Sequence, residues 1–294
     1  MTITAPPMRS LTPWLPLAPC EPVTCVAPAR RPAGVVRQTA RLTGAVLVLL
    51  AGLVFAMFAR RLSPDTLSRI TMAWSRLLLR TLGVKVSVSR GFSFVGGSAV
   101  AAKAVSGEAG SLMVANHISW LDPLVMAAVM PARLLAKSEI AAWPLIRTLV
   151  AGSGAIFIDR ERLSLLPGTV GEVTGALRAG DTVIAFPEGT TWCGQSMGGF
   201  RPAMFQAAID AGAAVRPATI RYTEDETTSA RPSYVGGDSL VGSITRVAST
   251  KHMIAEVTLF PPVGGAGQTR RSLAGVAEAQ VRTGLGRTPA GLHS

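Results

Sequence analysis

The sequence has little charge and few aromatic residues for its length. Of its 294 residues only 16% are charged and 5% are aromatic, whereas 48% are hydrophobic. So low a charged fraction is unusual in a soluble globular domain. Acids are especially scarce: 17 Asp and Glu stand against 29 Lys and Arg, which gives a net charge of +12. This excess predicts an anionic partner, either nucleic acid, anionic lipid or a phosphorylated or acidic substrate.

Nucleic-acid binding is disfavoured because the positive charge occurs together with high apolarity and few aromatic residues. Proteins that bind single strands interleave basic patches with aromatic side chains on which bases stack. Such patches are missing from this sequence. High apolarity combined with positive charge is more typical of a protein at the surface of an anionic bilayer. We therefore expect membrane lipids, and no nucleic acid, among its partners.

Cysteine is equally scarce. The three cysteines, Cys20, Cys25 and Cys193, provide no framework for a disulfide-stapled secreted fold. Cys20 and Cys25 lie in a proline-rich stretch without a nearby histidine, and Cys193 has the features of an ordinary loop cysteine. No phosphate-binding loop or dinucleotide fingerprint is present. The sequence therefore predicts no metal site and no bound cofactor.

The N-terminal part divides into a tail and an apolar segment. Residues 1–35 contain eight prolines and are expected to be disordered, because proline cannot sustain a helix interior or a central strand. From Leu42 to Ala59 every residue except Thr43 is apolar or small, and this length is close to that of a bilayer-spanning helix. Arginines flank the segment on both sides, so the positive-inside rule leaves its orientation open. Partial insertion is the alternative to full spanning.

An amphipathic helix is predicted over Leu67–Leu82. It opens with Ser63-Pro64-Asp65, a favourable cap, first-turn proline and acid. Its apolar residues recur at helical spacing, and arginines occupy the opposite face. We expect this helix to lie flat on anionic lipid, with packing against the domain as the alternative. Residues 36–83 are thus predicted to be membrane-embedded and interfacial helices.

Residues 84–263 alternate short apolar runs with helical patterns. The predicted strands are Val84–Ser89, Leu112–Ala115, Leu134–Ala136, Ala155–Ile158, Val183–Phe186, Val215–Ile220 and Ile254–Phe260. The predicted helices are Pro123–Met130, Ile140–Val150, Leu165–Ala179 and Pro202–Ala211. This alternation favours an α/β domain with a mixed, mostly parallel sheet flanked by helices. Residues 264–294 are expected to form a C-terminal tail with one weak helix.

His117 is the histidine best placed for catalysis. It follows an apolar strand, and Asp122 lies five residues later. That aspartate can accept a hydrogen bond from the ring, which fixes the tautomer and leaves the other nitrogen free to act as a base. By itself the pair is also compatible with a structural histidine. His252 lies just before a strand and His293 is next to the last residue, so both are poorer candidates.

Four segments, in this order, resemble the sequence blocks of the lysophospholipid acyltransferase family. They are Asn116-His117-x-x-x-x-Asp122, Gly154–Arg160, Phe186–Thr190 and Val215-x-Pro217. The resemblance covers about residues 84–222, and 200–205 also look like the basic segment of the family between its last two blocks. One departure concerns the acceptor. Many members continue the third block with Arg-Ser, whereas Thr191 and Trp192 follow here.

The resemblance implies a membrane-bound O-acyltransferase of phospholipid biosynthesis. It would transfer a fatty acyl group from acyl-CoA or acyl-carrier protein, as co-substrate, to the free hydroxyl of a lysophospholipid. The implied acceptor is 1-acylglycerol 3-phosphate, giving phosphatidic acid; glycerol 3-phosphate or an amino-acid-containing lysolipid is the alternative. The catalytic domain would lie on the cytoplasmic face of the cell membrane. A catalytically silent membrane-binding protein is a further alternative, against which the intact His117 and Asp122 argue.

The resemblance also implies roles for individual residues. His117 would take the proton from the acceptor hydroxyl, and Asp122 would orient His117. Asn116 and Ser119 would have supporting roles, with no nucleophilic serine. The substrate-binding residues would be Arg160, Glu188, Gly189, Thr190 and Arg201. Of these, Arg160 would bind the acceptor phosphate, and Arg201 would assist with anionic groups. Glu188 would hold a basic residue or cap backbone amides with Gly189 and Thr190.

Overall fold

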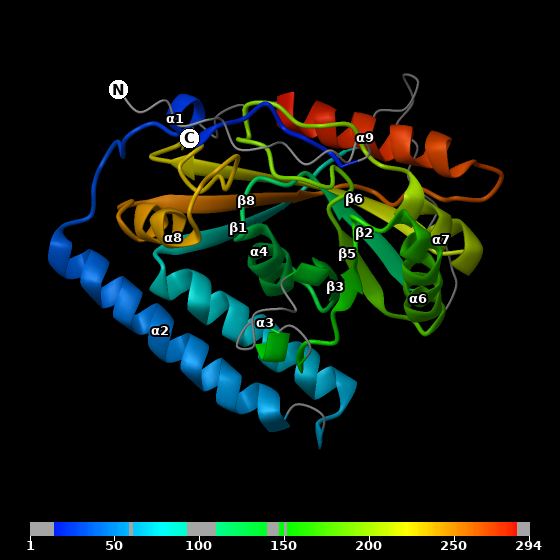
Figure 1. The fold of residues 1–294 in the computed structure, drawn as a ribbon, viewed down its shortest axis with the longest axis horizontal. Coiled ribbons are helices and arrows are strands. Elements are labelled where there is room, and N and C mark those ends of the chain that lie inside the picture. The colour runs from blue at the N-terminus through cyan, green and yellow to red at the C-terminus, as the bar shows by residue number, and fades with distance from the viewer. Residues whose placement is uncertain (1–14, 59–60, 93–109, 140–146, 150–151, 287–294) are drawn as a thin grey trace.

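A single eight-stranded sheet forms the centre of the protein in the computed structural model, which describes residues 15–58, 61–92, 110–139, 147–149 and 152–286. Seven strands follow the order β1-β8-β6-β2-β5-β3-β4, and β7 pairs with β6 (Figure 1). The strands are β1 (Val84–Arg90), β2 (Ser111–Ala115), β3 (Arg133–Lys137), β4 (Ile156–Ile158), β5 (Thr182–Ala185), β6 (Ala214–Glu224), β7 (Thr227–Thr228) and β8 (Met253–Leu259). Every pairing is parallel except those of β6 with β7 and β8, which confirms the predicted mixed, mostly parallel sheet.

Helices cover both faces of this sheet. They are α1 (Pro22–Cys25), α2 (Val35–Phe58), α3 (Pro64–Thr81), α4 (Asp122–Val129), α6 (Leu166–Arg178), α7 (Ala203–Ala211), α8 (Leu240–Ala248) and α9 (Arg270–Gly286), with a 3-10 turn, η3 (Leu163–Leu165). Side chains alternate along β2: Leu112 and Val114 pack with α6, α7 and α9, whereas Met113 and Ala115 pack with α3, α4 and α8. All five residues of β2 are buried, as expected for a central strand covered on both faces.

Most predicted elements are present. All seven predicted strands occur, and β6 continues to Glu224, beyond the predicted Ile220. The helices α4, α6 and α7 match their predictions to within one residue at each end. The helix predicted over Ile140–Val150 lies largely outside the described residues. The two-residue strand β7 and the helix α8 were not predicted from the sequence, although α8 is amphipathic and begins after an N-cap serine, Ser239.

The helix expected in the C-terminal segment is present as α9, but its assignment to a tail is wrong. Leu273, Ala274, Ala277 and Val281 are at most 3% exposed, and they join the cluster beneath α6 and α7. The helix therefore belongs to the α/β domain, although the sequence analysis ended that domain at residue 263. Three of the four buried side chains are small or β-branched, and arginines and glycines surround them, so the apolar face is inconspicuous in the sequence.

The predicted disorder of residues 1–35 is wrong for residues 15–34, here called the N-terminal strap. The strap follows the surface of the domain. Its backbone N–H groups donate hydrogen bonds to the domain, and its carbonyl groups accept hydrogen bonds from the domain. The N–H of Ala33 donates to the carbonyl of Ser249 at 2.7 Å, and the N–H of Arg30 donates to Oε1 of Glu224 at 2.8 Å. Arg231 donates to the carbonyl of Ala27 at 3.1 Å. Proline prevents a long helix here but not an extended segment whose remaining donors find acceptors on the domain.

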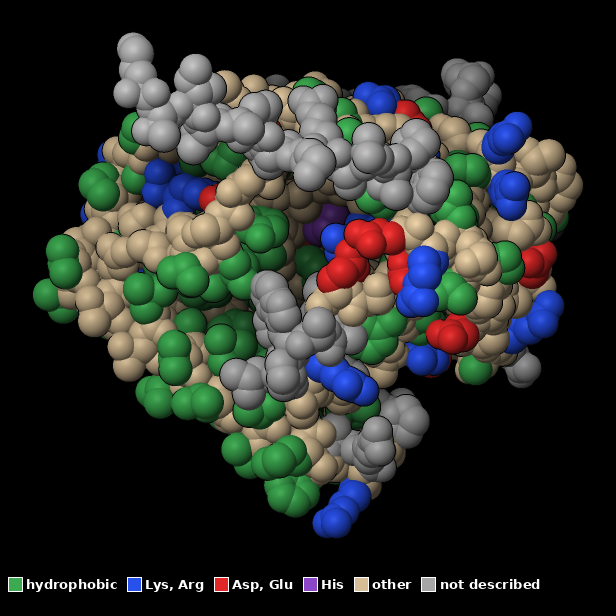
Figure 2. Space-filling model, in the orientation of Figure 1, with side chains coloured by type: hydrophobic (Ala, Val, Ile, Leu, Met, Phe, Trp, Pro, Cys, Tyr) green, Lys and Arg blue, Asp and Glu red, His purple; other side chains and the backbone are tan. Residues whose placement is uncertain are grey.

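The helix α2 presents apolar side chains to the surroundings. By length and composition it is the one helix among the described residues that could cross a membrane, with a mean hydropathy of 2.1 over its apolar window. Only 11% of that window is buried, so α2 is not a core helix. Its bare apolar side chains include Leu47, Leu50 and Met57, which are 61%, 52% and 63% exposed. Apolar side chains gather along the lower left edge of the molecule, over α2 (Figure 2).

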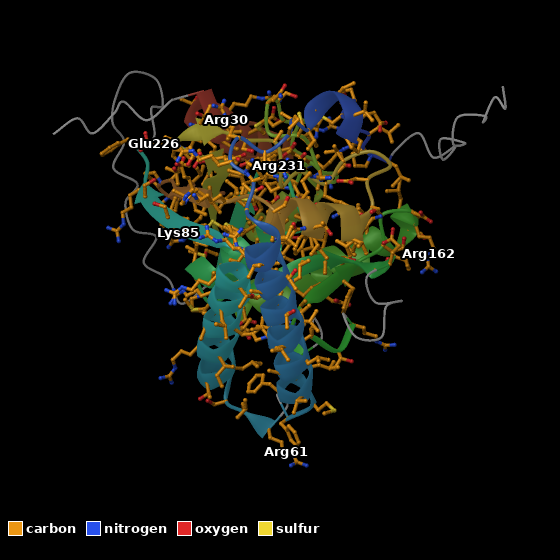
Figure 3. The ribbon with its side chains drawn as sticks, turned by 90° about the vertical axis from the view of Figure 1, so that its left-hand side faces the viewer. Arg30, Arg61, Lys85, Arg162, Glu226 and Arg231 are labelled. Atoms are coloured by element: carbon orange, nitrogen blue, oxygen red, sulfur yellow. The ribbon has the colours of Figure 1, made fainter. Side chains whose placement is uncertain are left out.

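The helix α3 packs between α2 and α4, so the prediction that its apolar face lies on lipid is wrong for Trp74 and Leu78, whereas Leu77 is 50% exposed. Figure 3 shows α2 and α3 side by side, with Arg61 at the tip of this hairpin. Trp74 donates from Nε1 to the carbonyl of Val48 on α2 at 2.9 Å, and Leu78 is 3% exposed. A Cβ at Gly52 would lie 2.3 Å from the indole nitrogen of Trp74, so glycine permits this close approach. An amphipathic pattern identifies an apolar face but not what covers it.

Candidate active site

The catalytic candidates lie at the carboxyl end of β2. His117 follows this strand, and its Nδ1 lies 2.8 Å from Oδ2 of Asp122 at the start of α4. The side chain of His117 is 15% exposed, whereas that of Asp122 is fully buried. The imidazole stacks on Phe186, with ring centroids 4.3 Å apart. Phe186 directly follows β5, the parallel neighbour of β2, so the ends of adjacent strands build this site.

The carboxylate of Asp122 accepts three further hydrogen bonds. Its Oδ2 accepts from the backbone N–H groups of Ile118 at 2.5 Å and Ser119 at 2.8 Å. Its Oδ1 accepts from the hydroxyl of Tyr222 at 2.7 Å. A carboxylate surrounded by donors is an acceptor for the ring, so Nδ1 of His117 carries the proton. Nε2 is then the nitrogen that can accept a proton.

Tyr222 is a site residue that the sequence analysis missed. It lies on β6, it is 1% exposed, and 100 residues separate it from Asp122. Burial raises the pKa of Tyr222 well above its usual value, and the negative charge of Asp122 adds to the effect, so the phenol remains a donor. One signal was available. A tyrosine stands on the face of β6 otherwise occupied by the apolar Ala218 and Ile220.

Asn116 and Ser119 hold the loop that carries His117. The side chain of Asn116 donates to the carbonyl of Ile220 at 2.9 Å and accepts from its N–H at 2.8 Å, which ties the loop to β6. The hydroxyl of Ser119 donates to the carbonyl of Pro232 at 2.5 Å and accepts from the N–H of Leu121 at 3.2 Å. Ser119 is fully buried. These contacts fit supporting roles and leave no free hydroxyl for a nucleophile.

Glu188 connects the third sequence block to His117. Its Oε1 accepts from the N–H of His117 at 2.7 Å, and its Oε2 accepts from the N–H of Gly198 at 2.7 Å. It therefore caps two backbone amides, which is one of the two roles expected of it. Burial raises the pKa of Glu188 to about 8, against the opposing effect of these two hydrogen bonds.

Arg160 braces the same block from the end of β4. Its Nη1 donates to the carbonyl of Gly189, whose φ of +74° is in the left-handed region that favours glycine. Burial lowers the pKa of Arg160, but a guanidinium remains charged. Among the described residues no carboxylate forms an ion pair with Arg160. A half-buried cation that uses one of its five N–H donors among the described residues can bind an anion.

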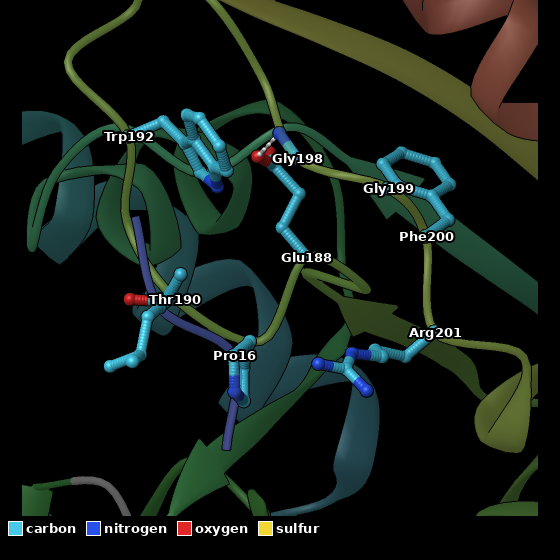
Figure 4. A pocket seen from close by; sticks show the side chains of 9 residues that line it. Pro16, Glu188, Thr190, Trp192, Gly198, Gly199, Phe200 and Arg201 are labelled. Carbon is cyan, nitrogen blue, oxygen red and sulfur yellow. Dashed lines mark hydrogen bonds between the residues drawn. The ribbon is translucent and has the colours of Figure 1, made fainter. Parts of the chain in front are cut away.

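A cavity of about 350 Å³ adjoins these residues (Figure 4). Its lining comes from the strap and from the segment after β5: Pro16, Leu17, Glu188, Thr190, Trp192, Gly198, Gly199, Phe200 and Arg201. The guanidinium of Arg201 extends toward Pro16. The structure thus divides the predicted site into two adjoining groups. His117, Asp122 and Arg160 do not line the cavity, and Glu188 connects the two groups.

Thr191 and Trp192, the residues that depart from the family pattern, have structural contacts. The hydroxyl of Thr191 donates to the carbonyl of Tyr234. The N–H of Trp192 donates to the carbonyl of His117 at 2.8 Å. The indole of Trp192 lines the cavity, and its Nε1 is buried with no hydrogen-bond partner in the described part of the chain. The cavity therefore has an aromatic wall where many family members carry arginine and serine.

A cluster of cysteines lies beside this loop, contrary to the sequence analysis, which treated them as unrelated. The sulfur atoms of Cys20, Cys25 and Cys193 lie within 4.8 Å of one another. The residues come from the strap and from the loop after the third block, so their spacing along the chain could not reveal the cluster. They are the residues of the described chain best placed to hold a metal.

Comparisons with known proteins agree with the geometry. Residues 97–221 match the family described as Acyltransferase. The lyso-ornithine lipid O-acyltransferase of Pseudomonas aeruginosa is 35% identical over 191 residues, which are 63% of this chain and 73% of that protein. The 1-acyl-sn-glycerol-3-phosphate acyltransferase of Neisseria meningitidis is 34% identical over 196 residues, or 66% and 71% of the two chains.

The same fold occurs in a solved structure. The crystal structure of the 1-acyl-sn-glycerophosphate acyltransferase of Thermotoga maritima is 17% identical and matches with a TM-score of 0.63, over 88% of this chain and 98% of that chain. The bare apolar helix α2 and the membrane-lipid relatives together indicate membrane association. The resemblance carried by the four sequence blocks is confirmed: this chain belongs to the lysophospholipid acyltransferase family and is a membrane-associated O-acyltransferase.

Proposed function

We propose that this enzyme transfers a fatty acyl group from acyl-CoA or acyl-carrier protein to the free hydroxyl of a lysophospholipid. The observation that carries the proposal is the 2.8 Å contact between His117 and the buried Asp122. Nε2 of His117 takes the proton from the acceptor hydroxyl as its oxygen attacks the thioester carbonyl. The carbon–sulfur bond then breaks, and the proton passes from His117 to the departing thiolate. Asp122 stabilises the imidazolium between these steps.

The acceptor proposed first is 1-acylglycerol 3-phosphate, which would become phosphatidic acid. Arg160 supports this choice, since its half-buried guanidinium is without an ion-pair partner among the described side chains. A phosphate can bind such a fork through two parallel hydrogen bonds. Arg201, which lines the adjoining cavity, provides a second positive charge for anionic groups of the substrates.

An amino-acid-containing lysolipid is the second candidate acceptor. It is favoured by the aromatic wall that Trp192 supplies and by the relative named as a lyso-ornithine lipid O-acyltransferase. Arg201, which also lines the cavity, can pair with the carboxylate of an amino-acid headgroup.

The catalytic domain is proposed to lie on the cytoplasmic face of the membrane. Both candidate donors are soluble thioesters or thioester-bearing proteins that approach from water. The net charge of +12 suits a leaflet with a negative surface potential. The helix α2 would hold the domain at this surface through its bare apolar side chains.

An acceptor panel tests the proposal. The purified full chain is offered 1-acylglycerol 3-phosphate, lyso-ornithine lipid and glycerol 3-phosphate, each with acyl-CoA and with acyl-carrier protein, and products are identified by mass. Acylation of 1-acylglycerol 3-phosphate, absent in His117→Ala, is the expected result. Preferential acylation of lyso-ornithine lipid selects the second candidate. Acylation of no lysolipid by folded protein contradicts the proposal.

A further inference from the structure

The cysteine cluster joins two segments that lie far apart in the sequence. Cys20 and Cys25 belong to the strap, and Cys25 is the last residue of α1. Cys193 follows Trp192, whose N–H donates to the carbonyl of His117. Cys20 and Cys193 are each 4% exposed, and Cys25 is half-buried. All three thiols are free, and they are the only cysteines of the chain.

The separations are close to those of a metal–thiolate site. Sulfur atoms bound to one zinc ion at about 2.3 Å in tetrahedral geometry lie about 3.8 Å apart. No separation here exceeds 4.8 Å, so the sulfurs have to approach one another by at most about 1 Å to reach that geometry. A mere apolar cluster of thiols is the alternative, since buried cysteine also behaves as a small hydrophobic residue.

We propose that Cys20, Cys25 and Cys193 bind a zinc ion that fastens the N-terminal strap to the loop beside the active site. Three thiolates match the preference of zinc for soft ligands. With a divalent ion the site carries one net negative charge. A monovalent ion would leave two negative charges among Val235, Ala18 and other apolar side chains, where charge is costly.

Binding requires the release of protons from the thiols. Cys25 is the most exposed of the three cysteines, so it is the first ligand that an incoming ion meets. Zinc displaces the thiol protons into solvent, and its affinity therefore rises with pH.

The zinc site would hold the strap over the cavity. Pro16 and Leu17 of the strap line the cavity together with Glu188 and Trp192. A Cβ at Gly189 would lie 2.7 Å from Cγ of Pro16, so the strap passes directly over the turn of the third block. Among the described residues no fourth acid, histidine or cysteine joins the three sulfurs, which leaves water as the fourth ligand.

Metal content tests the inference without reference to catalysis. The full chain is purified in detergent with a phosphine reductant, equilibrated with zinc, freed of loose metal on a chelating resin and analysed by mass spectrometry of the elements. We expect about one zinc per chain for the natural sequence. Cys25→Ser should bind zinc about 10- to 100-fold more weakly, a loss that even a supporting contact of a metal site can produce. Val23→Ala, on the same short helix and 95% exposed, is the matched control and should retain zinc.

Limited trypsin digestion tests the fastening of the strap. Arg30 and Arg162 are exposed, and Figure 3 shows them far apart, so cleavage after Arg162 provides an internal reference. Removal of zinc by a chelator should speed cleavage after Arg30 and leave cleavage after Arg162 unchanged. The inference is overturned if the natural protein retains no zinc, if Cys25→Ser with an unchanged circular dichroism spectrum retains as much, or if two of the cysteines form a disulfide in place of the metal site. Equal rates of cleavage after Arg30 with and without zinc would contradict the inference that zinc fastens the strap to the domain.

Discussion

Tyr222 donates its hydroxyl to Oδ1 of Asp122 at 2.7 Å, and neither side chain is more than 1% exposed. The bond connects β6 to the start of α4, so the carboxylate that orients His117 is itself held by the sheet. A hydrogen bond to a charged group is worth ~1.5–3 kcal/mol, and water cannot replace this donor in a buried site. Tyr222 is therefore a positioning residue that acts on His117 through Asp122.

Replacing Tyr222 by phenylalanine should lower kcat roughly 10- to 100-fold, the equivalent of that hydrogen bond. The acceptor KM should change little, because the lost bond lies behind the catalytic pair and not at the substrate. Steady-state kinetics on the preferred acceptor measure both constants. Tyr234→Phe changes the only other tyrosine and should leave kcat unchanged. A normal kcat for Tyr222→Phe would show that the backbone donors suffice to hold Asp122.

His117→Ala should abolish acyl transfer, because general-base catalysis contributes ~10²–10⁴-fold. Asp122→Asn should also lose much of the rate. The two carboxylate oxygens of Asp122 together accept four hydrogen bonds. Asparagine replaces one of these oxygens with an N–H₂ group, which cannot accept a hydrogen bond. Folding is monitored by circular dichroism and membrane binding by flotation. His252→Ala is the control, and turnover by His117→Ala near that of the control would disprove the mechanism.

Arg160→Ala should raise the acceptor KM and change kcat less, if this guanidinium binds the acceptor phosphate equally in the ground and transition states. The expected loss in kcat/KM is roughly 10- to 100-fold, and Arg160→Lys should recover only part of it. Arg162→Ala removes an exposed arginine two residues away and serves as the control.

Two other results would remove Arg160 from the acceptor site. A rise in the donor KM would place the guanidinium on the donor. A lower melting temperature with unchanged kinetics would mean that its bond to the carbonyl of Gly189 only braces the fold.

The pH dependence of stability should report on Glu188. Burial raises its pKa to about 8 in the folded protein, above the value of about 4.5 in an unfolded chain. The folded state therefore binds the proton more tightly, and this contribution to the free energy of unfolding is lost as pH rises through 8. Between pH 6 and pH 9 the loss amounts to about 2–3 kcal/mol.

Thermal unfolding of the natural protein and of Glu188→Gln at the two pH values measures this contribution. Glu188→Gln should be less stable at pH 6, because one of the two backbone N–H bonds is lost, but its melting temperature should fall less toward pH 9. Glu172→Gln, on the exposed side of α6, should keep the pH dependence of the natural protein. Identical pH dependence in all three proteins would assign the effect to other groups.

The exposed apolar side chains of α2 should bind the protein to membranes. Replacing Leu47 and Leu50 by glutamate should abolish flotation with anionic vesicles, since one charge in the centre of a bilayer helix costs about 2.5–3.5 kcal/mol. These side chains are 61% and 52% exposed, so the fold should persist. Val88→Glu, on the edge strand β1, is the control. Flotation of the double variant like that of the control would exclude α2 as the anchor.

The sequence determined those features that depend on neighbouring residues. Apolar runs alternating with helical patterns established the order of strands and helices and the mostly parallel sheet. The pair of His117 and Asp122 was visible because one short turn connects the two side chains. The apolar segment from Leu42 was also evident, and in the structure the helix extends from Val35 to Phe58.

What covers each apolar face was decided only by the tertiary structure. The amphipathic pattern of α3 was recognised, but it does not say whether lipid or protein lies against it, and α2 and α4 take that place. In α9 a few small side chains suffice for burial under α6 and α7, so the sequence pattern was too weak to show it. The strap is ordered because its backbone donors find acceptors such as Glu224, not because of a pattern of its own.

The partners of the catalytic pair also came from the tertiary structure alone. Glu188 binds the amide of a residue 71 positions away, and Tyr222 binds a carboxylate 100 positions away. The sulfurs of Cys20, Cys25 and Cys193 meet only when the strap lies across the domain. Hydrogen bonds and metal sites depend on distances of a few ångströms in space. A sequence determines those distances directly only within a turn, and elsewhere the packing of the sheet and its helices sets them.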